Sequence, residues 1–405
     1  MQKFDWWVEQ CRGLLVGNQV RNGRYRYTRP APHVYEYQWL WDSCFHAITY
    51  RWFDVAMAQD ELLSMVAKQV DAGADAGMIP HMNYWQPDGM ALWGQAERSI
   101  ITQPPLLAVA AELVYAKSGD KQFLRQMYDA VARYHAWFDR RRDPEGEHLV
   151  AVLHPWEPGC DASPRWDEPL GLNNPTAEET KAVRHGLVKR LIAHDCNAQA
   201  LAQAGSFYVK TAEFNAIRAA DLQALGRMAS ILGEHADWQT KAEQVNAAIQ
   251  RQMVREEGIV DLMGWEKRPL TPSVNGITAN AAHFILLFGG SVDDANAAKL
   301  VADLESDPYA TPYPVSTTPT NDPLFDPNSY WRGNVWLSVN WLIYQGLRRY
   351  GYAKQASHLA QRSLALVEQH GFHEYFNPLT GQGLGPAQQS WSAIVLDMLA
   401  TEVGR

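Results

Sequence analysis

Two acidic side chains about two hundred residues apart stand out, because aromatic residues surround both of them. Asp161 lies in segment 156–166, which also holds Glu157, a glycine, two prolines and two tryptophans. Glu374 lies between aromatic residues in segment 372–381. Apolar surroundings disfavour a charged carboxylate and raise its pKa, which suits a proton donor. We therefore expect Asp161 or Glu157 to donate a proton, and Glu374 to be a second functional carboxylate.

A third carboxylate, Asp42, lies beside two indoles in segment 37–43. It either caps the helix that follows or accepts hydrogen bonds from sugar hydroxyls beside the indole faces. The chain contains 16 tryptophans, and several form pairs among polar, Gly and Asp residues: Trp39/Trp41, Trp85/Trp93 and Trp331/Trp336. Since flat indole faces stack on the C–H faces of sugars, these pairs predict a carbohydrate-binding cleft.

A further aromatic loop, segment 78–85, contains Tyr84 and leads on to Gln103. This pattern is equally typical of a binding loop and of an aromatic loop packed at the edge of the fold. Segment 330–336 combines Trp331, Arg332 and Trp336 around a glycine.

Apolar residues recur with helical spacing along almost the whole chain. Strand-like alternation is scarce, and segment 149–153 is the best candidate for a strand. The predicted helices are 4–16, 44–58, 60–72, 104–118, 121–140, 178–194, 211–232, 237–253, 277–288, 293–305, 334–350, 354–370 and 388–402.

Short connectors such as 118–120 join these helices in pairs, and longer polar segments separate the pairs. Helical hairpins arranged around a ring would gather the long segments on one face, where such loops are usually functional. We see no linker, so we expect one domain spanning 1–405. The long segments are 18–38, 73–103, 141–177, 258–276, 306–333 and 371–387.

Composition excludes several classes of partner. The net charge of −9 and the lack of a basic block argue against nucleic acid and anionic membranes. Neither a membrane span nor a signal peptide is recognisable, and four scattered cysteines suggest reduced thiols in the cytoplasm. The 13 histidines form no metal-binding motif, so we expect neither a metal nor a cofactor.

Four segments together, 38–42, 156–164, 330–336 and 374–381, resemble glycoside hydrolase family 63. That family includes α-glucosidases and the hydrolases of mannosylglycerate and glucosylglycerate, and is more distantly related to trehalases. The motifs occur in order over nearly the whole chain. The resemblance implies an all-α (α/α)6 toroid and an inverting mechanism.

The resemblance also implies roles for individual residues. Asp161 matches the family's general acid and Glu374 its general base, although Ala162 stands where the family often has Asn. Expected sugar contacts are Tyr37, Trp39, Trp41, Asp42, Tyr84, Gln103, Glu157, Trp331, Arg332, Trp336 and Trp391. Glu157, if ionised and close, would raise the pKa of Asp161 further.

The sequence leaves the substrate open between a glycosylglycerate and a neutral disaccharide. A glycerate carboxylate needs a cation, for which Arg165, Arg184 and Lys210 are candidates. A sugar epimerase on the same toroid usually relies on histidines, and a non-catalytic carbohydrate-binding protein is a further alternative. Both a monomer and a homodimer fit the sequence.

Overall fold

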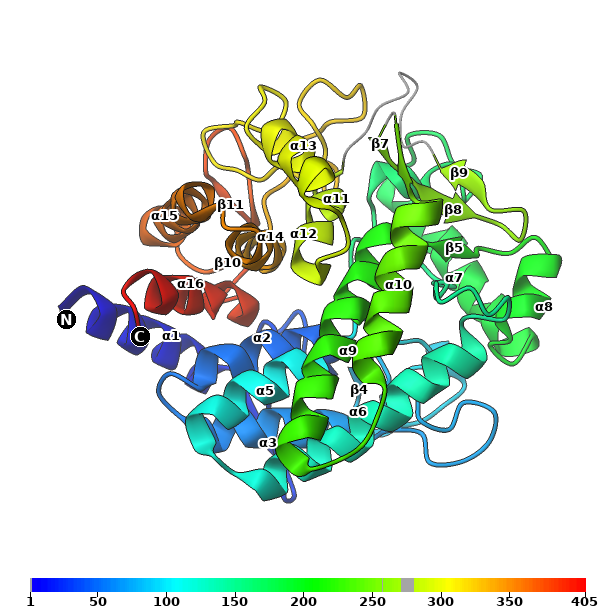
Figure 1. Cartoon of the computed structure of the whole chain (residues 1–405), viewed down its shortest axis with the longest axis horizontal. Helices are drawn as coiled ribbons and strands as arrows, with labels where there is room; N and C mark the ends of the chain where they lie inside the picture. Colours follow the sequence, from blue (N-terminus) through cyan, green and yellow to red (C-terminus); the bar gives the residue numbers. More distant parts are fainter. Residues whose placement is uncertain (1, 257, 271–279) are drawn as a thin grey trace.

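Helices dominate the computed structural model, which describes residues 2–256, 258–270 and 280–405 (Figure 1). The expected helix-rich fold is confirmed. No helix among the described residues is long and apolar enough to cross a membrane. The α-helices are α1 (Gln2–Gly17), α2 (Leu40–Tyr50), α3 (Val55–Val66), α4 (Met90–Trp93), α5 (Leu107–Ser118), α6 (Lys121–Arg141), α7 (Ala177–Ala193), α8 (Ala198–Gln203), α9 (Ala212–Leu232), α10 (Trp238–Gln252), α11 (Ala281–Phe284), α12 (Leu286–Gly289), α13 (Asp294–Leu304), α14 (Leu337–Arg349), α15 (Ala353–His370) and α16 (Val395–Glu402).

Contacts between helices follow a closed circuit. They run from α2 to α5, α9, α12 and α14, then to the 3-10 helix Ser390–Ile394 that leads into α16, and from there back to α2. A second set of helices packs on this circuit. The pairs are α3 on α2, α6 on α5, α10 on α9, α15 on α14 and α1 on α16. Beside α12, α13 packs on α11.

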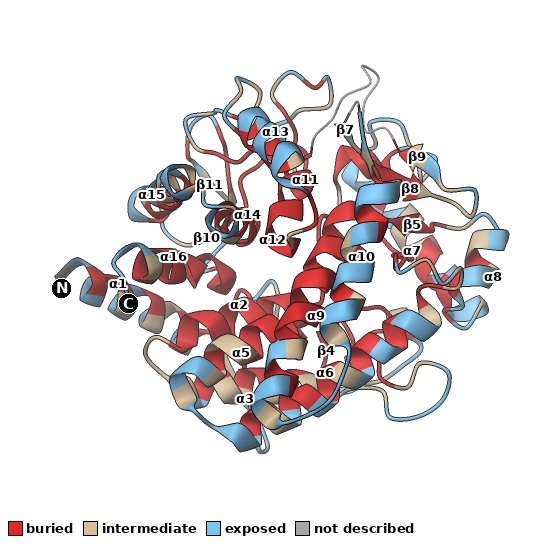
Figure 2. Cartoon of the chain, viewed as in Figure 1, coloured by how far each residue is buried: buried red, intermediate tan, exposed pale blue. Residues whose placement is uncertain are grey.

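The circuit helices form the core. Every residue of α2 is buried, as is the first two-thirds of α9, whereas α6, α10 and α15 expose one face (Figure 2). A helix that is buried all round must lie inside a large fold. The residues before α2 and before α14 therefore lie at the ends of rigid, buried elements.

Short turns with defined caps join the paired helices. In the connector 118–120, Gly119 adopts a left-handed conformation that ends α5. Asp120 then accepts hydrogen bonds from the backbone of Gln122 and Phe123 at the start of α6. These caps satisfy backbone groups that helix ends leave unpaired.

The predicted boundary between the second and third helices is wrong. The predicted helices 44–58 and 60–72 are instead α2 and α3, which meet near Asp54, the N-cap of α3. Since α2 begins at Leu40, Asp42 lies in its first turn, and the N-cap position belongs to Trp39. Of the predicted helix 277–288, the first three residues lie outside the described residues.

Short antiparallel strand pairs occupy segments between the predicted helices. The predicted strand 149–153 is wrong, since only Val152 forms an isolated bridge, with Val209. The strands pair as β1–β2, β3–β4, β5–β8–β9, β6–β7 and β10–β11. Their bounds are β1 (Gln19–Asn22), β2 (Tyr25–Thr28), β3 (Gln38–Trp39), β4 (Met82–Asn83), β5 (Val209–Lys210), β6 (Val254–Arg255), β7 (Gly258–Ile259), β8 (Asp261–Met263), β9 (Arg268–Leu270), β10 (His373–Phe376) and β11 (Gly383–Ala387).

Candidate active site

One cavity brings together carboxyl and aromatic groups from distant parts of the chain. It contains both of the residues expected to carry the chemistry and five of the expected sugar contacts. The lining residues are Pro30, Tyr35, Trp39, Trp41, Asp42, Gln103, Gly159, Asp161, Tyr330, Glu374, Gln389 and Trp391.

Three carboxyl groups meet in this cavity, from α2, from the loop after Trp156 and from β10. Burial raises the pKa of Asp161 to about 6. Burial also raises the pKa values of Asp42 and Glu374 to about 8, and the other carboxylates of the cavity add to this by repulsion. The cavity therefore holds protons on carboxyl groups near neutral pH, as acid–base catalysis requires.

Two tyrosine hydroxyls face the Glu374 carboxyl group. Tyr35 donates a hydrogen bond of 2.8 Å to Oε1, and Tyr330 a longer one of 3.5 Å. Both lower the pKa of Glu374 and so oppose the effect of burial. The indole of Trp391 donates to the Glu374 backbone carbonyl at 3.2 Å, which fixes the strand that carries the carboxyl group.

The hairpin β10–β11 places Glu374 against a glycine. Gly385 has a φ of +67°, and a Cβ built there would lie 2.5 Å from Glu374 Oε2. Only glycine combines this backbone conformation with such a close approach.

The loop that carries Asp161 lies against an indole. Gly159 has a φ of +77°, and a Cβ there would lie 2.6 Å from the ring of Trp41. Gln103 in turn accepts a hydrogen bond from the Trp41 backbone N–H. The start of α2 and the Asp161 loop therefore pack directly together.

Arg165 anchors the same loop in the core. Its guanidinium donates to Asp261 Oδ2 at 3.0 Å, to the carboxylate of Glu213, and to Cys160 Sγ at 2.6 Å. All these groups are buried. Since a buried guanidinium needs such partners, the pair of carboxylates holds the loop in one position.

Arg184 of α7 is the charged group beside Asp161. Its Nη1 lies 3.9 Å from Asp161 Oδ2, and the Asp161 side chain is 23% exposed. The positive charge lowers the pKa of Asp161, against the larger effect of burial.

Glu157 lies away from the cavity. Its two oxygens accept hydrogen bonds of 2.7 and 2.8 Å from Arg142, and further ones from the backbone of Thr102 and Leu153. Glu157 is not among the groups that shift the pKa of Asp161. The expectation that it raises this pKa is therefore wrong, because Arg142 neutralises it within the core.

Three expected sugar contacts from segment 330–336 lie outside the cavity lining and support it. Arg332 forms a two-bond ion pair with Asp167, at 2.7 and 3.1 Å. Trp331 and Trp336 stack with their ring centres 3.7 Å apart, and Trp336 packs edge-on against Trp391. Trp391 alone of these rings lines the cavity.

Tyr37 and Tyr84 also lie outside the cavity lining. The Tyr37 hydroxyl donates to Asp88, and its ring lies 4.7 Å from that of Tyr84. Tyr84 is buried and accepts a hydrogen bond from Trp93. Tyr84 therefore fits the alternative interpretation of segment 78–85, that of an aromatic loop packed at the edge of the fold.

Five further lining residues were not expected from the sequence: Tyr35, Tyr330, Gly159, Pro30 and Gln389. Tyr330 and Gly159 lie inside motifs that were recognised. Tyr35 precedes the aromatic run 37–41 by two residues, and that proximity is the only local signal for it.

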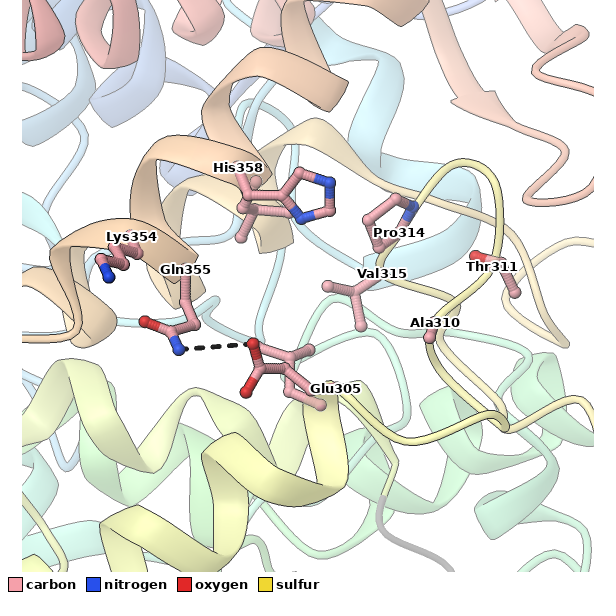
Figure 3. A pocket seen from close by; sticks show the side chains of 10 residues that line it. Glu305, Ala310, Thr311, Pro314, Val315, Lys354, Gln355 and His358 are labelled. Atoms are coloured by element: carbon pink, nitrogen blue, oxygen red, sulfur yellow. Dashed lines mark hydrogen bonds between the residues drawn. The ribbon is translucent and has the colours of Figure 1, made fainter.

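A second cavity lies elsewhere, between α13, α15 and segment 310–315 (Figure 3). Lys354 and His358 contribute from α15, and Gln355 donates to Glu305 at 3.3 Å. None of the expected site residues lines it.

Comparison with known proteins agrees with the geometry. Residues 35–392 match the model of the mannosylglycerate hydrolase MGH1-like glycoside hydrolase domain. The chain belongs to this family. It is thus a glycoside hydrolase of family 63.

Individual relatives extend over nearly the whole chain. The mannosylglycerate hydrolase of Thermus thermophilus is 32% identical, covering 92% of this chain and 96% of the relative. The glucosylglycerate hydrolase of Mycolicibacterium hassiacum is 29% identical, covering 95% and 96%. A crystal structure of a family 63 mannosylglycerate hydrolase from Thermus thermophilus, in complex with Tris and D-glycerate, superposes with a TM-score of 0.87 at 29% identity, covering 97% of this chain and all of that one.

The pH dependence of this family 63 enzyme should reflect the carboxyl groups of the cavity. We expect kcat/KM to be bell-shaped, with limbs near the values of about 6 and about 8 that burial imposes. A reaction that needs one protonated and one ionised carboxyl group stops below the lower limb, where both Asp161 and Glu374 are protonated, and above the upper limb, where both are ionised. The limbs belong to the pair as a whole. A profile with its acidic limb near pH 4, the ordinary carboxyl value, would contradict this account.

Replacing Gly385 by alanine should displace the Glu374 carboxyl group. We expect kcat to fall by about 100-fold, the loss typical of an ångström-scale misplacement. Gly351→Ala is the matched control, because Gly351 has a φ of +80° with open space around it. Both variants place alanine at a positive φ, but a Cβ at Gly385 would also lie 2.8 Å from Tyr375 Cε1 and 2.9 Å from Glu374 Cβ. The melting temperature of Gly385→Ala should therefore fall further, and kcat is compared at a temperature at which both variants are folded. Equal activity of the two variants would show that the Gly385 contact does not position Glu374.

Proposed function

We propose that this hydrolase is an inverting, exo-acting enzyme that cleaves a small α-linked glucoside or mannoside. Asp161 is the general acid and Glu374 the general base. The observation that carries this proposal is that both carboxyl groups line one cavity and have raised pKa values. Trp39, Trp41 and Trp391 supply aromatic faces in the same cavity for a sugar ring.

In the proposed reaction a water molecule attacks the anomeric carbon while the glycosidic C–O bond breaks. Glu374 takes a proton from this water, and Asp161 gives its proton to the leaving oxygen. Inverting enzymes place the two carboxyl groups on opposite faces of the sugar to leave room for the water. Tyr35 holds the Glu374 carboxylate through its 2.8 Å hydrogen bond.

For the substrate we favour a glycosylglycerate, because several curated relatives are named as hydrolases of mannosylglycerate or glucosylglycerate. Among the three candidate cations, Arg165 is saturated by Glu213 and Asp261. Lys210 is buried between Glu145 and Glu147. Arg184 remains, with Asp161 as its nearest carboxylate. We assign Arg184 to the glycerate carboxylate, which a guanidinium can hold through two hydrogen bonds.

The alternative of an epimerase has less support, because the residues that line the cavity include no histidine. The closed circuit of paired helices supports an (α/α)6 toroid built as one domain over 1–405. The four cysteines are free and buried, which suits a reducing cytoplasm. A monomer and a homodimer both fit this proposal.

The stereochemistry of the first product tests the mechanism. Proton NMR of the reaction with glucosylglycerate, mannosylglycerate and α-linked disaccharides should show the β-anomer first. Asp161→Asn and Glu374→Gln should each lower kcat by about 100-fold to 10,000-fold, the contribution typical of a positioned acid or base. The exposed carboxylates changed in Asp129→Asn and Glu243→Gln serve as controls. Early release of the α-anomer would rule out inversion.

Arg184→Gln tests the substrate. We expect KM for a glycosylglycerate to rise by about 10-fold to 100-fold, because the variant loses a hydrogen-bonded charge pair worth about 1.5–3 kcal/mol. KM for the matching glycosylglycerol, which lacks the carboxylate, should change little. Arg190→Gln, an exposed position on the same helix, is the control. An equal rise in KM for both substrates would argue against a carboxylate contact at Arg184.

A further inference from the structure

Arg184 lies close to Asp161 without forming a hydrogen bond to it. The gap of 3.9 Å between Nη1 and Oδ2 leaves both groups free for other partners. The guanidinium is held by Nε, which donates to the Thr180 carbonyl at 3.3 Å, and by the indole of Trp156 at 6.0 Å. Neither terminal nitrogen donates a hydrogen bond within the described part of the chain.

This arrangement works against the proposed acid in the free enzyme. Arg184 stabilises ionised Asp161, whose pKa is about 6, whereas that of the proposed base Glu374 is about 8. At neutral pH the proton therefore resides mainly on Glu374. A general acid must carry the proton when the glycosidic bond breaks, so the reacting form, with the proton on Asp161 and with Glu374 ionised, is the minor form of the free enzyme.

We propose that the aglycone carboxylate favours the reacting form: by pairing with Arg184, the carboxylate releases Asp161 from the guanidinium and thereby shifts Asp161 towards its protonated form. This inference rests on the proposed function, because it needs the glycerate carboxylate at Arg184. It adds that the substrate's own charge sets the protonation state of the acid.

The other titratable groups around Asp161 are acidic or neutral, or are already neutralised, so Arg184 is the cation that the substrate carboxylate would neutralise. A negative charge on Asp161 raises the pKa values of Asp42 on α2 and of Glu374 on β10. The phenols of Tyr35 and Tyr330 and the thiol of Cys160 also face it, all with raised pKa values.

Three further groups lie nearby. Arg332 reaches the Ala162 carbonyl, but Asp167 neutralises it. His154 donates a hydrogen bond from Nε2 to the Arg184 carbonyl at 3.1 Å, and burial lowers its pKa to about 3, so it is neutral. His185 follows Arg184 on α7 and packs against Trp156.

Binding of the carboxylate acts on Asp161 in two ways with the same sign. It neutralises the positive charge of Arg184, and it brings a negative charge of its own near Asp161. The enzyme then carries the proton more often on Asp161 and less often on Glu374. Asp161 passes this proton to the glycerate oxygen when the C–O bond breaks, and ionised Glu374 takes a proton from the attacking water. A neutral aglycone leaves the Arg184 charge acting on Asp161.

The experiment compares the pH dependence of kcat for an α-glycosyl-D-glycerate and for the matching α-glycosylglycerol. Raising the pKa of either carboxyl group moves the centre of the bell, the mean of its two limbs, to higher pH. Since an adjacent arginine lowers a carboxyl pKa by about one unit or more, we expect the glycerate centre to lie at least about 0.5 pH unit above the glycerol centre.

Arg184→Gln should raise the centre for the glycerol substrate and so reduce the difference between the two substrates. Arg190→Gln should leave the difference unchanged. The inference would be overturned if the wild-type pH profiles of kcat coincided for the two substrates while Arg184→Gln raised KM for the glycerate alone. That result would leave the proposed function intact. Failure to hydrolyse any glycosylglycerate would instead count against the proposed substrate, and with it this inference.

A binding measurement covers the case in which the neutral substrate is not turned over. By reciprocity, if glycerate favours protonated Asp161, then D-glycerate binding takes up protons. Calorimetry at pH 7 in buffers of different ionisation enthalpy should show net proton uptake with the wild-type enzyme and less with Arg184→Gln. Binding of D-glycerate without proton uptake would overturn the inference.

Discussion

The removal of three carboxyl groups from water, to which their mutual repulsion adds, is the constraint on which the site depends. Asp42, Asp161 and Glu374 share one cavity, and ionising all three there is costly because water is scarce and each charge disfavours the others. The hydroxyls of Tyr35 and Tyr330 and the guanidinium of Arg184 stabilise individual charges. Their positions therefore decide which carboxyl group holds a proton, and that distribution is what an acid–base pair needs.

The surrounding core keeps these groups in place. Arg165 ties the Asp161 loop to Glu213 at the start of α9, and the stacked pair Trp331 and Trp336 supports Trp391 behind Glu374. The first contact ties the loop to a member of the helix circuit, and the second joins the start of α14 to the 3-10 helix that holds Trp391. Removing one partner of such a buried ion pair would strand a charge in the core, which commonly costs about 3–5 kcal/mol.

Local sequence pattern was sufficient to predict most of the long helices and the carboxyl groups of the cavity, because periodicity and aromatic surroundings are local properties. It missed the short helices α4 and α8. It was insufficient for Glu157, whose surroundings in sequence match those of Asp161 but whose partner Arg142 comes from the end of α6. Tyr35 shows the same limit, since its contact with Glu374 spans more than three hundred residues. The boundary between α2 and α3 depends on the N-cap Asp54, which the apolar pattern does not reveal.

The distinct roles of Asp161 and Glu374 are the central claim, and an α-glycosyl fluoride tests them most directly. Fluoride leaves without protonation, so it removes the need for a general acid but not for a base. Relative to wild type, Asp161→Asn should hydrolyse the fluoride far better than it hydrolyses a glycosylglycerate, whereas Glu374→Gln should be impaired on both. Equal losses for both variants on both substrates, or the reverse pattern, would contradict the assignment.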